Sequence, residues 1–368
     1  MTASDAAADA AFMRRALRLA ARGLGRVAPN PAVGCVLARD GRVVGEGWHQ
    51  EYGGPHAEVE ALRVAGDQAR GATAYVTLEP CNHWGKTPPC TDALLAAGVA
   101  RVVVAVRDPF PAAAGGAERL RAAGVAVDVG TLGTEARELN APFLFAAAGA
   151  GRPWVTLKLA LSLDGAVADH TRGPGWLTGS ESRRAVHATR AAHDAVAVGI
   201  GTALADDPEL TVRAAPAPRV PPLRVVFDRR ARLPLGGRLA RTARDVGVVV
   251  VAGPDAPAAR LRALEDAGAR VVAAADLQGA LAALRRDHGV RALLVEGGAR
   301  IAGALWAADL VDRLVIFRAP LVLGAGAVPA FEGAPGARAG HARRLPVVGA
   351  RWHGADHATV YAVHDAPG

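Results

Sequence analysis

Short apolar runs that resemble strands alternate with segments of helical spacing along most of this chain, and this alternation restricts its fold more than any other feature. Apolar residues three to four apart predict a helix, and short apolar runs between turn residues predict buried strands. In the first part of the chain, these patterns predict helices at 10–24, 56–65, 91–97 and 117–123 and strands at 33–38, 43–48, 74–78, 99–106 and 125–129. Such alternation is typical of an α/β protein in which helices cover a sheet.

Residues 146–153 interrupt this alternation, because their sequence Ala-Ala-Ala-Gly-Ala-Gly-Arg-Pro lacks apolar periodicity and predicts a linker. A second α/β pattern follows. It predicts helices at 180–192 and 299–306, strands at 154–159, 195–198, 223–227, 246–251, 270–272 and 292–295, and closing strands within 314–320 and 347–364. A chain of 368 residues is long enough for two domains. We expect them at 1–146 and 153–368.

The chain is basic, with 43 lysine and arginine residues against 35 acidic ones, and only Lys86 and Lys158 are lysines. An excess of positive charge is a feature of proteins that bind nucleic acids. Here, however, the arginines are scattered among acidic residues, and no run of five basic residues occurs. Aromatic residues, which stack on bases, make up 4% of the chain. We therefore expect no nucleic-acid partner, whereas small phosphorylated substrates remain compatible with the charge.

Other features of the sequence indicate the compartment. No apolar run approaches the roughly 18 residues that a membrane-spanning helix needs, and the first residues do not resemble a secretory signal. The three cysteines are too few for a disulfide framework, which favours a reducing compartment. One of them, Cys35, lies in an apolar strand and is expected to be buried. We expect a cytoplasmic protein with no membrane partner.

One histidine and the two other cysteines are arranged like zinc ligands. His56 opens a predicted helix, Cys81 follows a predicted strand, and Cys90 comes nine residues later. One imidazole and two thiolates leave a fourth zinc position for water, whose pKa the metal lowers toward neutrality. Glu58, two residues from His56, can move a proton of that water without being a ligand. Zinc deaminases share this arrangement, but two residues usually separate their cysteines and here there are eight. Taken singly, each of these residues is equally a buried or capping residue.

The residues around these cysteines resemble a known family. The run at 77–90, Thr-Leu-Glu-Pro-Cys-Asn-His-Trp-Gly-Lys-Thr-Pro-Pro-Cys, resembles the deaminase part of the bifunctional riboflavin-biosynthesis deaminase/reductase family. Asn-Pro-x-Val-Gly at 30–34 and Gly-x-His at 47–49 add to the resemblance. The long Gly-Lys-Thr-Pro-Pro-Cys loop distinguishes this family from cytidine, guanine and tRNA-adenosine deaminases. Asn82 stands where the family more often has serine.

The resemblance implies a role for each matching residue of the first half. It implies one zinc ion per chain, with Glu58 as the catalytic proton carrier and three ligands: His56, Cys81 and Cys90. It also implies four substrate contacts: Asn30, His49, His83 and Lys86. A lysine in a Gly-Pro loop suits a phosphate. Taken alone, Lys86 has a second interpretation as a solvated surface lysine, and His49 has one as a structural histidine.

In the second half, a glycine pair separates the predicted strand that ends near Glu296 from the helix at 299–306. Its backbone amides can approach a phosphate, although the pair is equally a plain tight turn. No G-x-G-x-x-G motif marks a standard dinucleotide site. The motifs Lys-Leu-Ala-Leu-Ser-Leu-Asp-Gly at 158–165, Trp-Leu-Thr-Gly at 176–179 and Ala-Asp-Asp-Pro at 205–208 resemble the reductase of the same family. That resemblance implies a dihydrofolate-reductase-like α/β fold that uses NADPH.

The second resemblance also implies site residues. Those implied to line NADPH are Ala160, Trp176, Thr202, Asp206, Gly298, Ala299, Arg300, Ile301, Ala302, Gly303 and Ala304. The implied substrate contacts are Arg190, Leu210, Arg213 and Glu296, of which the two arginines suit a phosphate. Lys158 and Asp206 are implied near the hydride-transfer centre, as candidate catalytic residues.

Two residue pairs and one proline in this half have a second interpretation. Asp206 and Asp207 are equally a turn pair before a proline. Arg229 and Arg230 are either contacts for the 2′-phosphate of NADPH or a solvated pair after a strand. Pro174 stands where the family usually has a serine that contacts the substrate. Because proline has no hydroxyl, this contact is missing here, and loss of the reductase activity is one interpretation.

The alternation predicts two α/β domains, and the resemblance implies that the N-terminal one is a cytidine-deaminase-like three-layer domain and the C-terminal one a dihydrofolate-reductase-like α/β domain. The resemblance implies a multifunctional enzyme of riboflavin biosynthesis and a homo-oligomer. Its first step is hydrolytic deamination of 2,5-diamino-6-ribosylamino-4(3H)-pyrimidinone 5′-phosphate. Its second step reduces the ribosyl to a ribityl chain, giving 5-amino-6-ribitylamino-uracil 5′-phosphate.

Two alternatives come from other function classes. A nucleic-acid base deaminase with an appended domain would bind RNA or DNA in a salt-sensitive manner. A non-catalytic protein stabilised by zinc would keep its partner binding after Glu58→Gln, whereas a deaminase would stop releasing ammonia.

Overall fold

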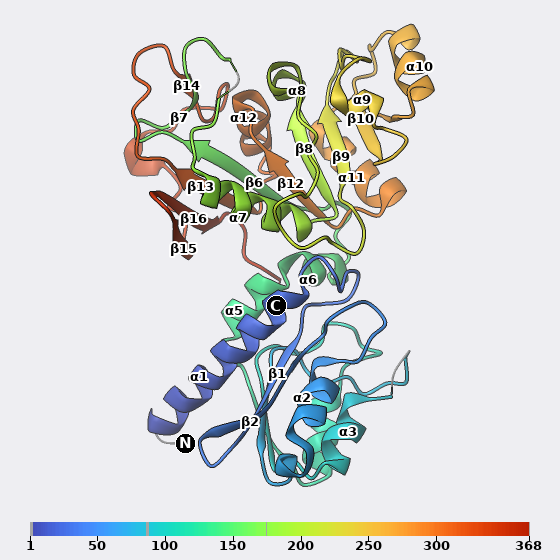
Figure 1. Cartoon of the computed structure of the whole chain (residues 1–368), viewed down its shortest axis with the longest axis vertical. Coiled ribbons are helices and arrows are strands. Elements are labelled where there is room, and N and C mark those ends of the chain that lie inside the picture. Colours follow the sequence, from blue (N-terminus) through green and yellow to red (C-terminus); the bar gives the residue numbers. More distant parts are fainter. Residues whose placement is uncertain (1–2, 86–87, 174, 368) are drawn as a thin grey trace. The chain divides into compact units, whose positions relative to one another are not determined.

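A computed structural model of the chain describes residues 3–85, 88–173 and 175–367. The chain divides into two compact units, Met1–Gly149 with Ala366–Gly368, and Ala150–Asp365 (Figure 1). Within the described ranges, no helix combines the length and the apolar character that crossing a bilayer requires.

The first unit contains a five-stranded sheet in the order β2-β1-β3-β4-β5. Its strands are β1 (Gly34–Arg39), β2 (Arg42–Trp48), β3 (Thr73–Val76), β4 (Arg101–Val104) and β5 (Ala126–Val129). Strand β1 pairs antiparallel with β2 and β3, and β3, β4 and β5 run parallel. The carboxyl ends of β3 and β4 therefore lie at the same edge of the sheet.

Helices cover both faces of this sheet and make three layers. They are α1 (Ala3–Ala20), α2 (Ala57–Ala65), α3 (Cys90–Ala96), α4 (Gly116–Ala122), α5 (Gly133–Leu139) and α6 (Ala141–Ala147), with short 3₁₀ turns at Ala21–Gly23 and Gly66–Ala69. Because strand side chains alternate between faces, Cys35 and Leu37 pack with α2, α3 and α4, whereas Val36 packs with α1 and α5. Figure 1 shows α1 and α2 on opposite sides of β1 and β2. The predicted three-layer architecture is confirmed.

Two glycines allow helices to pack directly on strands. A Cβ at Gly34 in β1 would lie 2.1 Å from the carbonyl oxygen of Ala16 in α1. A Cβ at Gly47 in β2 would lie 2.4 Å from the carbonyl oxygen of Ala57 in α2. Any side chain at Gly47 would push α2 away from the sheet, and α2 carries the predicted proton carrier Glu58.

The second unit contains a nine-stranded sheet in the order β11-β10-β9-β8-β12-β6-β13-β16-β15. Its strands are β6 (Trp154–Leu161), β8 (Ala195–Gly199), β9 (Leu223–Phe227), β10 (Val248–Ala252), β11 (Arg270–Ala273), β12 (Ala292–Glu296), β13 (Arg313–Arg318), β15 (Val347–His353) and β16 (Asp356–Ala362). The strands from β11 to β13 run parallel, and β16 and β15 complete the sheet antiparallel. Strands β7 (Ala166–Ala168) and β14 (Val328–Pro329) form a separate small sheet.

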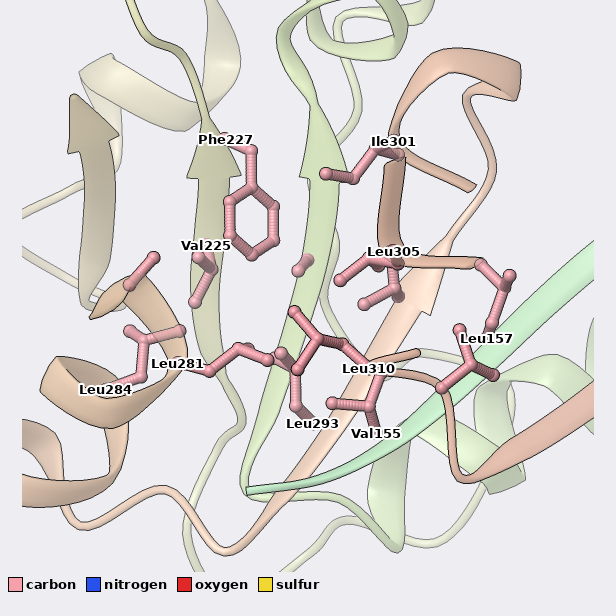
Figure 2. Packing of buried hydrophobic residues seen from close by; sticks show 14 of the residues in the cluster. Val155, Leu157, Val225, Phe227, Leu281, Leu284, Leu293, Ile301, Leu305 and Leu310 are labelled. Atoms are coloured by element: carbon pink, nitrogen blue, oxygen red, sulfur yellow. The ribbon is translucent and has the colours of Figure 1, made fainter. Parts of the chain in front are cut away.

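Helices cover both faces of the parallel part. They are α7 (Ser180–Ala191), α8 (Ile200–Asp206), α9 (Arg238–Arg241), α10 (Ala258–Asp266), α11 (Leu277–His288) and α12 (Ala299–Ala307), and a 3₁₀ turn lies at Ala339–His341. On one face, Leu293 of β12 and Val225 of β9 pack against Leu281 of α11 and Leu305 of α12 (Figure 2). On the other face, the core includes residues of α8, α9 and α10. The chain returns at β12 between β8 and β6, and such a switch point is where open α/β sheets bind ligands.

Several predicted boundaries were wrong. The first helix begins at Ala3 instead of residue 10, because its alanine-rich start is helical without an apolar stripe. The linker predicted at 146–153 starts too early, since α6 continues to Ala147 and buries Leu144. Helices α5, α6, α8, α9, α10 and α11 were not predicted.

Candidate active sites and family

A histidine nitrogen and two cysteine sulfurs meet at one edge of the first sheet. His56 precedes α2, Cys81 follows β3, and Cys90 is the first residue of α3, and their ligand atoms all lie within 4.8 Å of one another. Nδ1 of His56 is 3.2 Å from Sγ of Cys90 and 3.5 Å from Sγ of Cys81. Hydrogen bonds with Cys90 and with His56 lower the pKa of Cys81 to about 4. One imidazole and two sulfurs fit a zinc ion that keeps a position open.

Glu58 lies in the first turn of α2, next to this cluster. Its side chain is buried, and burial raises its pKa to about 6. It lines a cavity of about 310 Å³ that also reaches His56 and Cys81. A carboxyl group with such a pKa can both accept and release a proton near neutral pH.

Asn30 and His49 line the same cavity. Nδ1 of His49 is 3.0 Å from the carbonyl oxygen of Pro55, and Nε2 is 3.4 Å from Nδ2 of Asn30. Because a carbonyl only accepts, Nδ1 donates to Pro55 and Nε2 accepts from the Asn30 amide. Burial lowers the pKa of His49, which favours this neutral form. His83 is exposed at the rim of the cavity, and Lys86 falls outside the described residues.

The cavity also contains residues that sequence reasoning missed, namely Tyr52, Asp108, Phe110 and Phe143. Asp108 could have been found, because it follows β4 and the parallel strands β3 and β4 end at the same edge. Burial raises the pKa of its carboxyl group. The rings of Phe110 and Phe143 meet edge to face at 5.4 Å. No feature of the sequence indicated Phe143, because it lies on α6, a helix that was not predicted.

In the second unit, three predicted residues meet near the carboxyl ends of β6 and β12. Lys158 of β6 and Glu296 of β12 are register partners. Arg190 of α7 donates from Nε to Oε1 of Glu296 at 2.5 Å and from Nη2 to Oε2 at 2.8 Å. Burial opposes ionisation of Glu296, but the hydrogen bonds and charge of Arg190 hold its pKa below the ordinary value. Burial lowers the pKa of Lys158.

The segment 209–213 lies against α7 beside this cluster. Arg190 donates from Nη1 to the carbonyl oxygen of Thr211 at 2.9 Å, and the backbone N–H of Arg213 donates to Nδ1 of His187 at 3.3 Å. Leu210 is buried with a φ of 53°, a strained conformation for this residue. The Arg213 side chain pairs with Glu209. Of the four residues predicted to contact the reductase substrate, Arg190 and Glu296 therefore bond directly, whereas Leu210 and Arg213 lie on the neighbouring segment.

Only some of the residues predicted to line the cofactor lie close together. Gly297 and Gly298 have φ values of 64° and 86°, and a Cβ at Gly298 would lie 3.1 Å from Oγ1 of Thr202. The glycine turn after β12 therefore touches the first turn of α8, and residues 299–304 form the start of α12. Ala160 lies on the same face of β6 as Lys158.

Other predicted positions in this half are less enclosed. Trp176 is 77% exposed and stacks on Arg183, which was not in the predicted set. Asp206 is the last residue of α8, and Asp207 accepts from the backbone N–H of Arg238. Arg229 donates to the carbonyl oxygen of Ala275 at 3.1 Å. Pro174 lies outside the described part of the chain.

Both halves of the chain match known families. Residues 6–106 match the cytidine and deoxycytidylate deaminase zinc-binding region, and residues 153–351 match the RibD C-terminal domain. The riboflavin biosynthesis protein RibD of Aquifex aeolicus is 42% identical over 321 residues, which cover 86% of this chain and 88% of that protein. The chain belongs to the RibD family. RibD of Escherichia coli is 41% identical over 341 residues, covering 87% of this chain and 89% of that protein.

Solved structures of the RibD family agree with this assignment. The structure of Acinetobacter baumannii RibD, form 1, has a TM-score of 0.79 at 39% identity and covers 97% of this chain and 99% of that chain. A diaminohydroxyphosphoribosylaminopyrimidine deaminase/5-amino-6-(5-phosphoribosylamino)uracil reductase of Thermotoga maritima also has a TM-score of 0.79, at 34% identity and the same coverage.

Membership of the RibD family confirms the family, fold and function that the motifs predicted. The protein is a bifunctional deaminase and reductase of riboflavin biosynthesis that acts on small pyrimidine substrates. Its deaminase part uses zinc, and its reductase part uses NADPH. A base deaminase of nucleic acids and a non-catalytic zinc protein are not favoured.

Proposed function

We propose that residues 1–146 are the zinc-dependent deaminase and residues 153–368 the NADPH-dependent reductase, acting in turn on one phosphorylated pyrimidine. The first substrate is 2,5-diamino-6-ribosylamino-4(3H)-pyrimidinone 5′-phosphate, and the final product is 5-amino-6-ribitylamino-uracil 5′-phosphate. The observation that carries the proposal is the buried Glu58 beside His56, Cys81 and Cys90 in a cavity of about 310 Å³.

In the deaminase, His56, Cys81 and Cys90 would hold zinc, which supplies a water that is acidic enough to be activated at neutral pH. Glu58 accepts a proton from the attacking water and passes it to the amine that leaves as ammonia. Its raised pKa suits both transfers, because the same carboxyl group must accept and then donate. Burial of Glu58 limits its contact with bulk water.

Polar groups around the cavity orient the pyrimidine ring and its ribose phosphate. The amide of Asn30 and the ring of His49 are fixed by their mutual hydrogen bond and by Pro55. Asp108 faces the same cavity and can accept from ring amines. His83 at the rim, together with Lys86, would contact the phosphate.

In the reductase, NADPH supplies a hydride to the ribosyl C1′ when it is bound. Lys158 and Asp206 are the candidate catalytic groups, and the partly buried position of Lys158 beside Glu296 supports the first of these. Arg190, Leu210, Arg213 and Glu296 would bind the substrate, with the two arginines toward its phosphate. Arg190 uses one N–H of Nη1 for Thr211 and one N–H of Nη2 for Glu296. Each of these nitrogens carries a second hydrogen that can be donated to a phosphate.

The cofactor would lie across the switch point between β8 and β12. The open glycine pair at 297–298 lets its phosphates approach the first amides of α12. The cofactor-lining set we propose is Ala160, Trp176, Thr202, Asp206 and residues 298–304.

We place the protein in the cytoplasm as a homo-oligomer that does not bind nucleic acid. The scattered arginines support the last point, since many of them pair with acidic neighbours: Arg15 with Glu46, Arg101 with Asp9, Arg152 with Asp312 and Arg286 with Asp287. Binding of RNA at physiological salt would contradict it.

The test follows both products by mass. Substrate and zinc should give ammonia and replacement of an amino group by oxygen, and added NADPH should then add two hydrogens to the sugar. Cys90→Ser should abolish ammonia release but leave reduction of the deaminated compound. Cys35→Ala, at a cysteine that packs in the core and does not belong to the ligand cluster, is the matched control and should keep both activities. Failure of the unaltered protein to release ammonia would contradict the proposal.

A further inference from the structure

The residues that follow the two cysteines of the zinc site are tied to each other and to α4. Oδ1 of Asn82, next to Cys81, accepts from Oγ1 of Thr91 at 3.3 Å and from Nη1 of Arg119 at 2.8 Å. Arg119 lies on α4, and its Nη2 donates to Oδ1 of Asp92. One guanidinium group thus bonds to the residue after Cys81 and to the second residue after Cys90.

Helix α4 is itself fixed to the chain just before Cys81. The backbone N–H of Ala117 donates to Oε1 of Glu79 at 2.9 Å. A Cβ at Gly116 would lie 1.9 Å from the carbonyl oxygen of Pro80, so the first turn of α4 rests directly on the segment before the cysteine. The guanidinium of Arg119 therefore extends from a helix whose position relative to Cys81 is already set.

The spacing of the cysteines explains why such a tie is needed. In a Cys-x-x-Cys site a single tight turn fixes both sulfurs, whereas here eight residues separate them. A longer loop has more conformations to lose before its ends meet. Two backbone contacts also join the ends: the N–H of Cys90 donates to Sγ of Cys81, and the N–H of Thr91 donates to the carbonyl oxygen of Cys81, each at 3.3 Å.

We propose that Arg119 and Asn82 are positioning residues that hold Cys81 and Cys90 at the separation that zinc requires. The proposal rests on the zinc site proposed above. Within the described part of the chain, neither residue lines the substrate cavity, so they act through the cysteines and not on the substrate. The side chains of Arg119 and Asp92 are about two-fifths exposed, and exposed ion pairs add little to folding. Their effect should therefore appear in zinc affinity more than in overall stability.

The experiment measures zinc affinity of the full chain by competition with a chromophoric chelator. Arg119→Ala and Asn82→Ala should each weaken zinc binding about tenfold, the lower end of what outer contacts of metal sites contribute. At limiting zinc their deaminase kcat should fall, and excess zinc should restore it with KM for the pyrimidine unchanged. Asn82→Asp keeps the accepting oxygen and should bind zinc as the unaltered protein does.

Arg121→Ala is the matched control, because Arg121 is also on α4, is equally exposed and bonds to Glu118 and Val127 instead. It should keep the original zinc affinity. NADPH oxidation by the same chain, with deaminated substrate supplied, reports whether each variant has folded. If Arg119→Ala does not fold, Asp92→Asn removes only the charge of the pair, and its zinc affinity should still fall several-fold.

Unchanged zinc affinity in Arg119→Ala, or in Asp92→Asn if that variant replaces it, would overturn the inference. An equal loss of zinc affinity in Asn82→Asp and Asn82→Ala would also overturn the inference. If the unaltered chain binds no zinc, the proposed zinc site fails, which is a separate result.

Discussion

Glu58 is the single side chain on which proton transfer in the deaminase depends. It is buried beside the zinc-ligand cluster without belonging to it. Glu58→Gln should therefore lower the rate of ammonia release by about 10²–10⁴-fold, the usual contribution of general acid–base catalysis, while the zinc content stays at one ion per chain. Glu60→Gln is the control, since Glu60 pairs with Arg63 on the same helix and is not among the described residues that line the cavity. Ammonia release at the original rate by Glu58→Gln would contradict the assigned role.

Lys158 is the corresponding residue of the reductase. Its side chain is partly buried and lies beside Glu296 in the sheet register, and its amine is 5.6 Å from the ring centre of Phe317. Lys158→Met keeps the length of the side chain and removes the charge. NADPH oxidation should fall at least 100-fold, with NADPH binding and ammonia release unchanged. Arg184→Met, at an exposed position of α7, should keep full activity. Equal rates of NADPH oxidation in Lys158→Met and Arg184→Met would exclude a role of Lys158 in hydride transfer.

At the scale of elements, the zinc site depends on how closely α2 rests on β2. Gly47→Ala would place a Cβ 2.4 Å from backbone atoms of Ala57 and Ala61, which cannot move without shifting the helix. We expect a loss of about 1–3 kcal/mol in the free energy of unfolding, together with weaker zinc binding. Gly151→Ala adds its Cβ in open space and should change neither. Thermal melts and zinc content measure the two effects. A Gly47→Ala protein with unchanged thermal stability and unchanged zinc content would contradict this packing.

Helix α1 is attached to the sheet by Asp9. This buried carboxylate accepts from the Tyr75 hydroxyl at 2.9 Å and from Arg101 at 2.7 and 2.9 Å. Burial raises the pKa of Asp9, but the hydrogen bonds outweigh it and hold the pKa below the ordinary value. Because the pKa of Asp9 is lower in the folded state than in the unfolded state, the ionised carboxylate stabilises the fold. The stabilisation is therefore complete above about pH 4 and is lost as the pH falls through the pKa of the folded state.

Asp9→Asn should consequently lower the free energy of unfolding by about 2 kcal/mol at pH 7, and the difference should shrink in acid. Urea unfolding at pH 7 and pH 3 measures it. Asp128→Asn removes the exposed partner of the same arginine and should cost about 0.5 kcal/mol or less. A pH-independent difference for Asp9→Asn would show that its charge is not what matters.

The elements that were predicted correctly are those whose pattern is local. Buried strands such as β9 and the hairpin at 39–42 follow from apolar runs and turn residues. Helices α5 and α6 have only seven residues each, and helices this short depend on packing against the rest of the unit for their stability. The same distinction holds in the sites. His56, Cys81 and Cys90 have recognisable spacing, whereas Asp108 and Phe143 reach the cavity only through the fold.

For the whole molecule, each unit supplies all the described residues of its own site. The zinc ligands, Glu58 and the cavity residues lie in Met1–Gly149, and Lys158, Arg190 and Glu296 lie in Ala150–Asp365. The two activities should therefore be separable within one intact chain. Separable activities would assign one reaction to each unit.

Removal of zinc tests this separation of activities most directly. The protein is dialysed against a strong chelator, and ammonia release and NADPH oxidation are then measured separately, each with its own substrate. We expect ammonia release to disappear and to return when zinc is restored, while NADPH oxidation with the deaminated substrate keeps its original rate throughout. Loss of both activities together, or ammonia release that persists without zinc, would contradict the account.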